Sequence, residues 1–254
     1  MRRLLLLILS VMLVVAAYRY MPARIAAFAL RGQIDPLELN NIHGTAWDGE
    51  SFGAWWGDEP LGHLTWHADP VAALGGMLRA DLHFRLPKDQ RMQAHIEQRA
   101  HTLNVTALRA DLVGDALHKV FMHADLLPIG SVHLDIDHAR FDDGVPVAVS
   151  GRAYWRQATL IGPRTPLPYY LGDLVVDFGV EKPGVVLGHI HDNGGPMQVG
   201  GNVTADLIGY KVALHFTARD PRLAEGLNRL GQAQPDGSRL LILQDAWWWK
   251  RKHG

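Results

Sequence analysis

MQVGGNVTADLIGYKVALHFTA, residues 197–218, is the stretch that decides the fold. In both halves of it, apolar side chains occupy every second position and mostly polar side chains lie between them. The apolar sets are Met197, Val199, Gly201, Val203, Ala205 and Leu207, and then Tyr210, Val212, Leu214, Phe216 and Ala218. A period of two predicts β-strands with one dry and one wet face. Because the link between the halves is short, we expect antiparallel neighbours.

The same alternation recurs upstream, most clearly over residues 77–86. Weaker runs cover residues 61–68, 93–100, 102–112, 132–141, 147–160, 174–180 and 185–191. Short links rich in glycine and proline separate these runs, which leaves little room for the crossover helices that parallel strands need. The chain beyond its start is therefore predicted to be mainly β, with one large antiparallel, curved sheet or sandwich-like domain and a few short helices.

Three short helices are expected between the strands. Residues 71–74 follow Asp69 and Pro70, which supply an N-cap and a proline at the first helical position. Residues 114–121 form the second candidate. Residues 222–230, with leucines at helical spacing, form the third.

The start of the chain has a different pattern. Arg2 and Arg3 precede an apolar run over residues 4–17. Positive charge before an apolar helix keeps that end in the cytoplasm, and a spanning helix needs about 17 to 25 residues. We therefore expect a membrane anchor of residues 1–21, with a helix over about residues 4–20. Residues 22–254 would form one domain beyond the membrane.

The residues that end this run suit a membrane boundary. Tyr18 and Tyr20 are the aromatic type found at the interface, and Arg19 can extend toward the headgroups. Two other interpretations stay open. One is a signal peptide cleaved near Ala17, because the run also has the length and small residues of such a peptide. The other is a buried helix of the core.

Composition excludes several classes of function. The formal net charge is −1, so no overall positive field favours nucleic acid as a partner. The chain has no cysteine, which excludes disulfides, thiolate metal sites and cysteine nucleophiles. About 230 residues remain after the anchor, which is enough for a core that needs no disulfides.

Candidate chemical sites are weak. His189 and His191 share one strand face and are candidate metal ligands, but no third ligand is identifiable. His133, Asp135 and Asp137 likewise share a face, which is also what an ordinary wet sheet face gives. No serine lies in a nucleophile elbow, and no glycine pair precedes a helix as a phosphate loop requires. The sequence therefore predicts no catalytic residue, no metal and no cofactor.

Eight tryptophans are the unusual feature of the composition. Trp247, Trp248 and Trp249 stand near the end and are followed by Lys250 and further basic residues. Tryptophan beside basic side chains is typical of a membrane interface. The other interpretation is a final strand that packs one ring inward and ends in a solvated basic tail.

Taken together, the segments of this chain resemble the type II secretion system protein N family, also called general secretion pathway protein N. The segments that carry the resemblance are HGTAWDG (43–49), LGHLTWHADP (61–70), LGG (74–76), GRAYW (151–155), LGDL (171–174), NGGPM (193–197), GY (209–210) and GSR (237–239). The family positions carried over to this chain are Gly44, Thr45, Trp47, Gly49, Trp66, Pro70, Gly194, Gly195 and Pro196. The Trp-Trp-Trp-basic ending departs from the family pattern.

The resemblance implies a bitopic inner-membrane protein of a Gram-negative bacterium, with a short cytoplasmic N-terminus and a large periplasmic domain. Such a protein is a non-enzymatic accessory part of the secretion apparatus. Its implied partners are inner-membrane platform proteins, the outer-membrane secretin and membrane lipid, and its role is to support export of folded exoproteins. The alternative prediction is a membrane-tethered periplasmic protein that binds or transfers lipid in an AsmA-like β groove.

Overall fold

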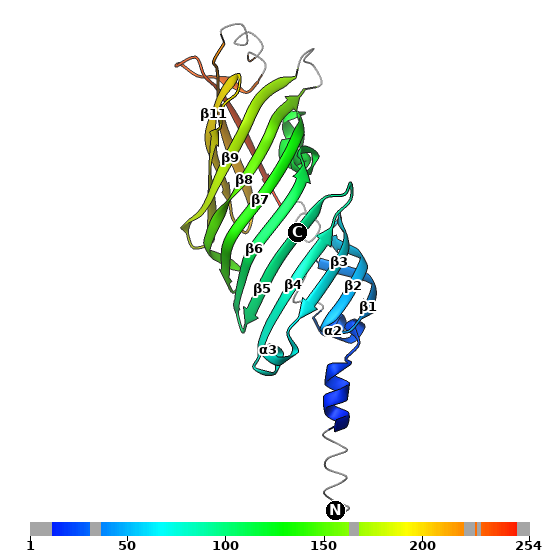
Figure 1. The fold of residues 1–254 in the computed structure, drawn as a ribbon. Helices are drawn as coiled ribbons and strands as arrows, with labels where there is room; N and C mark the ends of the chain where they lie inside the picture. Colours follow the sequence, from blue (N-terminus) through cyan, green and yellow to red (C-terminus); the bar gives the residue numbers. More distant parts are fainter. Residues whose placement is uncertain (1–11, 31–36, 163–167, 221–226, 228–229, 248–254) are drawn as a thin grey trace, which may run out of the picture. The chain divides into compact units, whose positions relative to one another are not determined.

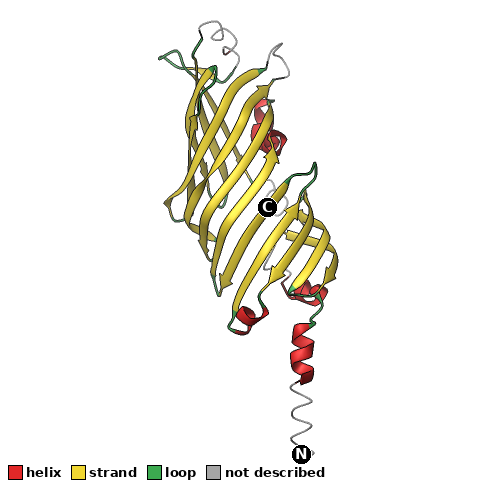
Figure 2. Ribbon diagram, viewed as in Figure 1, coloured by secondary structure: helices red, strands yellow, loops and turns green. Residues whose placement is uncertain are grey.

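The computed structural model describes residues 12–30, 37–162, 168–220, 227 and 230–247 (Figures 1 and 2). The chain divides into two compact units, one of Met1–Asp89 with Gln93–Ala100 and one of Gln90–Met92 with His101–Gly254. Both units consist mainly of antiparallel strands, most of which pair in chain order, with few short helices between them (Figure 2). The prediction of a mainly β, antiparallel chain is therefore confirmed.

Among its described residues, the first unit contains five strands and two named helices. They are α2 (Ala23–Leu30), β1 (Leu37–Gly44), β2 (Asp48–Trp56), β3 (Glu59–Ala68), α3 (Pro70–Leu74), β4 (Met77–Arg85) and β5 (Arg91–Arg99). Helix α3 begins as predicted, because the Asp69 carboxylate accepts the backbone N–H groups of Val71 and Ala72. Helix α2 lies against β1, where the Arg24 guanidinium donates to the carbonyl of Ile42.

The second unit contains the long strands. They are β6 (Thr102–Val113), β7 (Leu127–Asp142), β8 (Val145–Ile161), β9 (Tyr169–Lys182), β10 (Val185–Asp192), β11 (Met197–Ala205), β12 (Gly209–Ala218), β13 (Gln232–Ala233) and β14 (Arg239–Ala246). The short helices η1 (Gly114–Leu117), α4 (His118–Phe121) and η2 (Met122–Ala124) connect β6 to β7. The predicted helix over residues 114–121 is therefore interrupted, with 3₁₀ turns on either side of one α turn.

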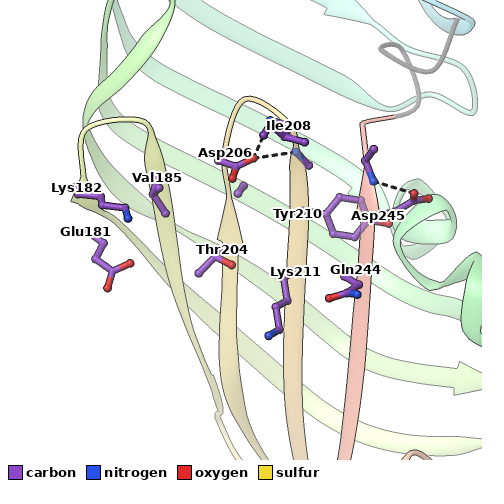
Figure 3. A pocket seen from close by; sticks show the side chains of 13 residues that line it. Glu181, Lys182, Val185, Thr204, Asp206, Ile208, Tyr210, Lys211, Gln244 and Asp245 are labelled. Atoms are coloured by element: carbon purple, nitrogen blue, oxygen red, sulfur yellow. Dashed lines mark hydrogen bonds between the residues drawn. The ribbon is translucent and has the colours of Figure 1, made fainter. Parts of the chain in front are cut away.

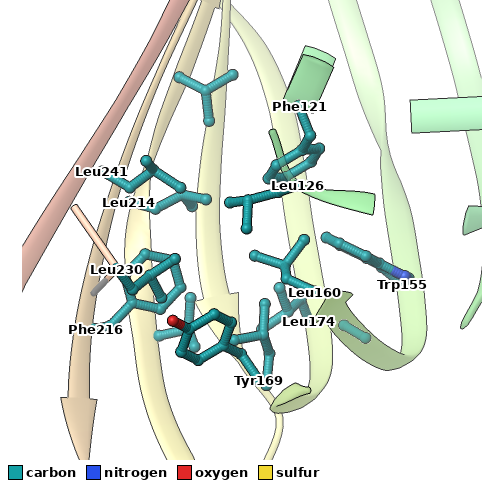
Figure 4. Close-up of a cluster of buried hydrophobic side chains, with 14 of the residues drawn as sticks. Phe121, Leu126, Trp155, Leu160, Tyr169, Leu174, Leu214, Phe216, Leu230 and Leu241 are labelled. Atoms are coloured by element: carbon teal, nitrogen blue, oxygen red, sulfur yellow. The ribbon is translucent and has the colours of Figure 1, made fainter. Parts of the chain in front are cut away.

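The core of the second unit shows that its sheet curls. Val132 and Trp155, on β7 and β8, share one buried cluster with Leu241 and Leu243 on β14 (Figure 4). Side chains from strands far apart in the sheet order can meet only if the sheet bends round on itself. Phe121 of α4 packs in the same cluster, so the apolar face is filled by the chain's own residues.

The hairpin over residues 197–218 has the predicted dry face, with one exception. Met197, Val199, Val212 and Phe216 are buried on the dry face. Leu207 was assigned to that face but is 48% exposed. It lies in the turn after β11, where the alternation of a strand no longer applies.

The predicted anchor is described only in part. Residues 12–19 are helical, whereas residues 1–11, with Arg2 and Arg3, lie outside the described residues. Within the residues that the structure describes, no helix has both the length and the apolar character needed to cross a bilayer. The predicted helix over residues 222–230 is also mostly outside the described part. Its Leu227 and Leu230 are described and buried.

Candidate functional site

The turn between β1 and β2 contacts the end of the N-terminal helix and the residues just after it. Trp47 in this turn is only 5% exposed. Its indole N–H donates to the carbonyl of Tyr18 over 2.8 Å, and the two rings lie 4.7 Å apart between centroids. The Tyr18 hydroxyl in turn donates to the carbonyl of Pro70 over 2.6 Å. We call Tyr18, Met21, Trp47, Trp66 and Pro70 the anchor clamp.

Backbone geometry fixes the Trp47 side of the anchor clamp. Gly44 has a φ of +85° and lies so close to Asp48 that a Cβ would clash with its carbonyl oxygen. The Thr45 hydroxyl accepts the backbone N–H groups of Trp47 and Asp48, which closes the turn. The N–H of Ala46 donates to the carbonyl of Met21 over 2.8 Å. The turn therefore binds the entering chain through backbone as well as side chains.

Trp66 supports the turn from β3. Its ring lies over Gly49, where a Cβ would come within 2.3 Å of the indole. Its indole N–H donates to the carbonyl of Ala46 over 3.2 Å. The glycine is therefore required by the close approach of the tryptophan, and both serve to hold the Thr45–Trp47 turn in place.

Pro70 is positioned by the cap of α3. Hydrogen bonds from the backbone N–H groups of Ala72 and Val71, together with the charge of Arg79, lower the pKa of the Asp69 carboxyl. The Arg79 guanidinium also donates to Glu97 over 2.6 Å. The carboxylate therefore stays ionised at neutral pH, and the first turn of α3 presents the Pro70 carbonyl to Tyr18.

The remaining family positions form a second group at the turn between β10 and β11. Gly195 passes so close to Gly172 that a Cβ would lie 2.9 Å from its Cα. Arg219 donates to the carbonyl of Gly195 over 2.9 Å and to the carboxylate of Asp192 over 2.5 Å, and its N–H donates to the carbonyl of Pro196. We call Asp192, Gly194, Gly195, Pro196 and Arg219 the turn lock.

The turn lock also holds an acidic group in its ionised form. Burial raises the pKa of Asp192, but hydrogen bonds from Arg219 and from the backbone N–H groups of Gly194 and Val199 outweigh burial, so the pKa is lowered. The Asp192 carboxylate thus acts as a structural partner of the turn.

Comparison with known proteins identifies the family. The family model for "Type II secretion system (T2SS), protein N" matches residues 35–241. This chain belongs to that family. A curated relative, Type II secretion system protein N of Vibrio cholerae serotype O1, is 25% identical over 187 residues, which are 71% of this chain and 72% of the relative. No solved structure matches the chain significantly.

In this member of the protein N family, the metal candidates have other partners. His189 Nδ1 lies 2.8 Å from the Asn202 side-chain oxygen, and His191 Nδ1 lies 3.6 Å from Asp177. Within the described ranges, no three His, Asp or Glu side chains are grouped as metal ligands would be.

The polar side chains of β7 that were candidates for acid–base or metal chemistry are also paired with other side chains. His133 is 2.7 Å from Asp111, and Arg109 donates to Asp135 over 3.3 Å. These side chains form pairs across neighbouring strands, which is the ordinary arrangement of a wet sheet face.

The predicted interface residues divide into two groups. Tyr20 is exposed, and Arg19 beside it is exposed as well, whereas Tyr18 is part of the anchor clamp. Trp247 is partly buried and packs against the core of the second unit. Arg2, Arg3, Trp248, Trp249 and Lys250 lie outside the described residues.

One surface feature was missed by sequence reasoning. Leu127 and Ile129 of β7, Ile161 of β8 and Tyr170 of β9 are all exposed on the outer face of the second unit. Leu127 pairs directly with Ile161, and Thr159 lies between Ile129 and Tyr170 in the register. We call these four residues the outer apolar patch. In the sequence, these apolar residues lie on the polar side of the alternation in three strands. Only the strand register shows that they are neighbours.

Proposed function

We propose that this protein is a non-enzymatic accessory component of the type II secretion apparatus, tethered to the inner membrane with its strands in the periplasm, where it binds other components. The observation that carries the proposal is the family match over residues 35–241. That range includes the Trp47 side of the anchor clamp, the turn lock and the outer apolar patch.

The N-terminal helix supports the membrane tether. Met12, Leu13, Val14 and Val15 lie on the described part of this helix, and each is 60–70% exposed. Consecutive aliphatic side chains around a helix are unfavourable in water but favourable in lipid. Arg2 and Arg3 precede them in the sequence, which places the N-terminus in the cytoplasm under this proposal.

The anchor clamp gives the tether a mechanical role. Under this proposal the chain leaves the membrane near Tyr18, and the contact between Tyr18 and Trp47 holds the strands of the first unit close to that point. A domain held without a flexible linker stays at a defined height and orientation, and its effective concentration for other membrane-bound components rises.

The burial of the dry faces supports protein binding over lipid handling. A lipid groove requires an open apolar face, whereas Leu160, Leu171 and Phe216 of the second unit are fully buried in its own core (Figure 4). Leu64 and Phe84 of the first unit are buried as well. The apolar surface that remains open in the second unit includes the outer apolar patch.

The outer apolar patch has the character of a protein contact. None of its four side chains is charged, whereas the same outer face carries ion pairs such as Arg152–Asp177 further along the strands. Charged residues are depleted at the centre of protein interfaces, and aromatic residues are enriched there. We therefore assign the patch to an apolar surface on another component of the apparatus, a platform protein or the secretin.

Site-specific photocrosslinking in secreting cells tests this assignment. A photoreactive amino acid replaces Tyr170 in the full chain, and the matched control carries it at Gln198, which is exposed on the outer face of β11. We expect crosslinks to platform proteins or the secretin from position 170 and none from position 198. Recovery of lipid without any secretion component from position 170 would contradict the proposal and favour lipid handling.

A further inference from the structure

The wet face of the first unit carries two exposed aromatic rings on strand β2. Phe52 is 55% exposed and Trp55 is 39% exposed. Ser51 and Ala54 are buried on the dry face, and the register between β2 and β3 shifts between these two residues. The backbone therefore bulges at Phe52 and Gly53, and both residues leave the dry face. A β-bulge often re-aims a side chain beside a functional site.

The Phe52 ring contacts a histidine on each neighbouring strand. It stacks on His63 of β3, with the ring centroids 4.7 Å apart and the planes 4° apart, and it meets His43 of β1 edge-on at 5.8 Å. His63 Nε2 in turn lies 3.0 Å from the Glu50 carboxylate. The exposed ring is therefore held in place by the protein before any partner binds, which lowers the entropic cost of binding.

Gly53 leaves the Trp55 indole uncovered. A Cβ on Gly53 would lie 3.4 Å from the Cβ of Asn40 and 3.8 Å from the indole nitrogen of Trp55. Asn40, Gly53 and Trp55 therefore lie together on the wet face, and position 53 has no side chain to fill the space beside the indole. We call Asn40, Phe52, Gly53, Trp55 and His63 the aromatic face.

Trp55 differs from other tryptophans of the chain in its hydrogen bonding. Four of them donate the indole N–H to a backbone carbonyl, namely Trp47, Trp66, Trp155 and Trp247. The acceptor of the last is Asp206, at the hairpin turn drawn in Figure 3. Within the residues that the structure describes, neither the indole N–H of Trp55 nor the side-chain amide of Asn40 has a hydrogen-bond partner. The aromatic face thus combines aromatic surface with unused donors.

Charges of both signs surround the aromatic face. Glu38 pairs with Trp55 in the register, and Glu50 lies beside His63. On the other side of His63, its partner in the register is the exposed Arg85. This balance favours a ligand of little net charge over a strongly anionic or cationic one.

We propose that the aromatic face binds a proline-rich segment of another protein in the polyproline II conformation. Proline rings pack on exposed aromatic side chains, and the segment is already ordered before it binds. A polyproline II helix has no internal hydrogen bonds, so its carbonyls can accept from the Trp55 indole and the Asn40 amide. The inference goes beyond the proposed function by naming a second contact surface and the chemistry of its partner. Only the partner's membership of the secretion apparatus rests on that function.

Fluorescence anisotropy with the full chain in detergent tests this proposal. The probe is a fluorescein-labelled peptide of ten prolines, and the control peptide has the same length and alternates glycine with serine. We expect the protein to bind the proline peptide and not the control peptide. Phe52→Ala and Trp55→Ala should each weaken binding about fivefold or more, as loss of a central interface side chain does. Val71→Ala, at an exposed apolar position of α3 in the same unit, should bind like the parent.

Gly53→Leu tests the same surface without removing a ring. Its Cβ would make only ordinary contacts, so the variant should keep the circular dichroism spectrum of the parent while its side chain covers the Trp55 indole and weakens binding. Absence of binding by the parent, or equal binding by parent and Gly53→Leu, would overturn the proposal. Binding of chitohexaose in place of the proline peptide would also overturn it and assign the face to a glycan. None of these results depends on secretion, so the crosslinking experiment judges the proposed accessory function separately.

Discussion

At the scale of single residues, Trp47 both fills a buried position with its ring and binds the N-terminal helix with its indole N–H. Its ring is buried in the first unit, and its indole N–H reaches the carbonyl of Tyr18, 29 positions earlier in the chain. The nearby Trp55 is exposed and has a different environment, although both lie in the same tryptophan-rich segment. The two tryptophans therefore form a natural pair for a comparison.

We expect Trp47→Phe to destabilise the first unit by about 1–3 kcal/mol, because it removes one buried hydrogen bond and part of the buried ring. Trp55→Phe should change stability by less than about 0.5 kcal/mol. Hydrogen exchange followed by mass spectrometry, on the full chain in detergent, measures this through the peptides of β2 and β3. Equal exchange in the two variants would show that the Tyr18 contact contributes nothing to stability.

At the scale of elements, the turn lock joins three strands through one ion pair. Asp192 ends β10, Arg219 follows β12, and the Gly194–Gly195 turn opens β11. The carboxylate accepts two backbone N–H groups as well as the guanidinium. The stability of this end of the second unit should therefore depend on the ionisation of Asp192.

The pKa of Asp192 is lowered in the folded state, so its stabilising contribution is present above the unfolded pKa and is lost as pH falls through the folded pKa. We expect Asp192→Asn to cost about 1 kcal/mol at neutral pH. The variant should also lose less stability than the parent between about pH 5 and pH 2. Urea unfolding of the full chain across this range measures both effects. Parallel pH profiles for parent and variant would contradict the assignment.

Strand prediction succeeded where side-chain alternation is unbroken and failed where the backbone departs from it. β1, β2 and β13 were not predicted, and β14 was foreseen only as the alternative of a final strand near Trp247. β1 contains Asn40 and Asn41, which are typical of turns. In β2 the register shifts between Ser51 and Ala54, so the period of two is lost. In β14 the apolar residues are consecutive, and the exposed Ile242 cannot be told from its buried neighbours.

The geometry around the positions taken from the family resemblance could not be predicted from the sequence. Spacing cannot show that Trp47 contacts Tyr18, because that contact depends on how the helix enters the first unit. Glycines illustrate the same limit. A Cβ on Gly201 would lie 2.0 Å from the carbonyl oxygen of Ala213, whereas one on Gly200 would have no neighbour closer than 3.9 Å. The two are adjacent and identical in sequence, and only the approach of β12 distinguishes them.

At the scale of the whole molecule, the N-terminal helix and the first unit are linked by contacts as well as by the chain itself. Tyr18, Met21 and Trp47 belong to one cluster of that unit. If the proposed tether works through orientation as well as attachment, the identity of the apolar helix matters less than the presence of Tyr18 at its end. The helix would then orient the first unit as well as attach it to the membrane.

A set of chimeras tests whether the Tyr18 contact orients the first unit. Replacing residues 1–17 with an unrelated single-pass helix of the same orientation should preserve membrane fractionation and exoprotein secretion, because Tyr18 still reaches Trp47 and Pro70. The same chimera with Tyr18→Ala should stay in the membrane fraction but secrete less, since the anchor clamp has lost its ring and hydroxyl. Tyr20→Ala, at an exposed position, is the matched control and should secrete normally. Full secretion by the Tyr18→Ala chimera would show that the N-terminal segment only attaches the protein to the membrane. Loss of secretion by the parent chimera would point to a specific role for the native helix within the bilayer.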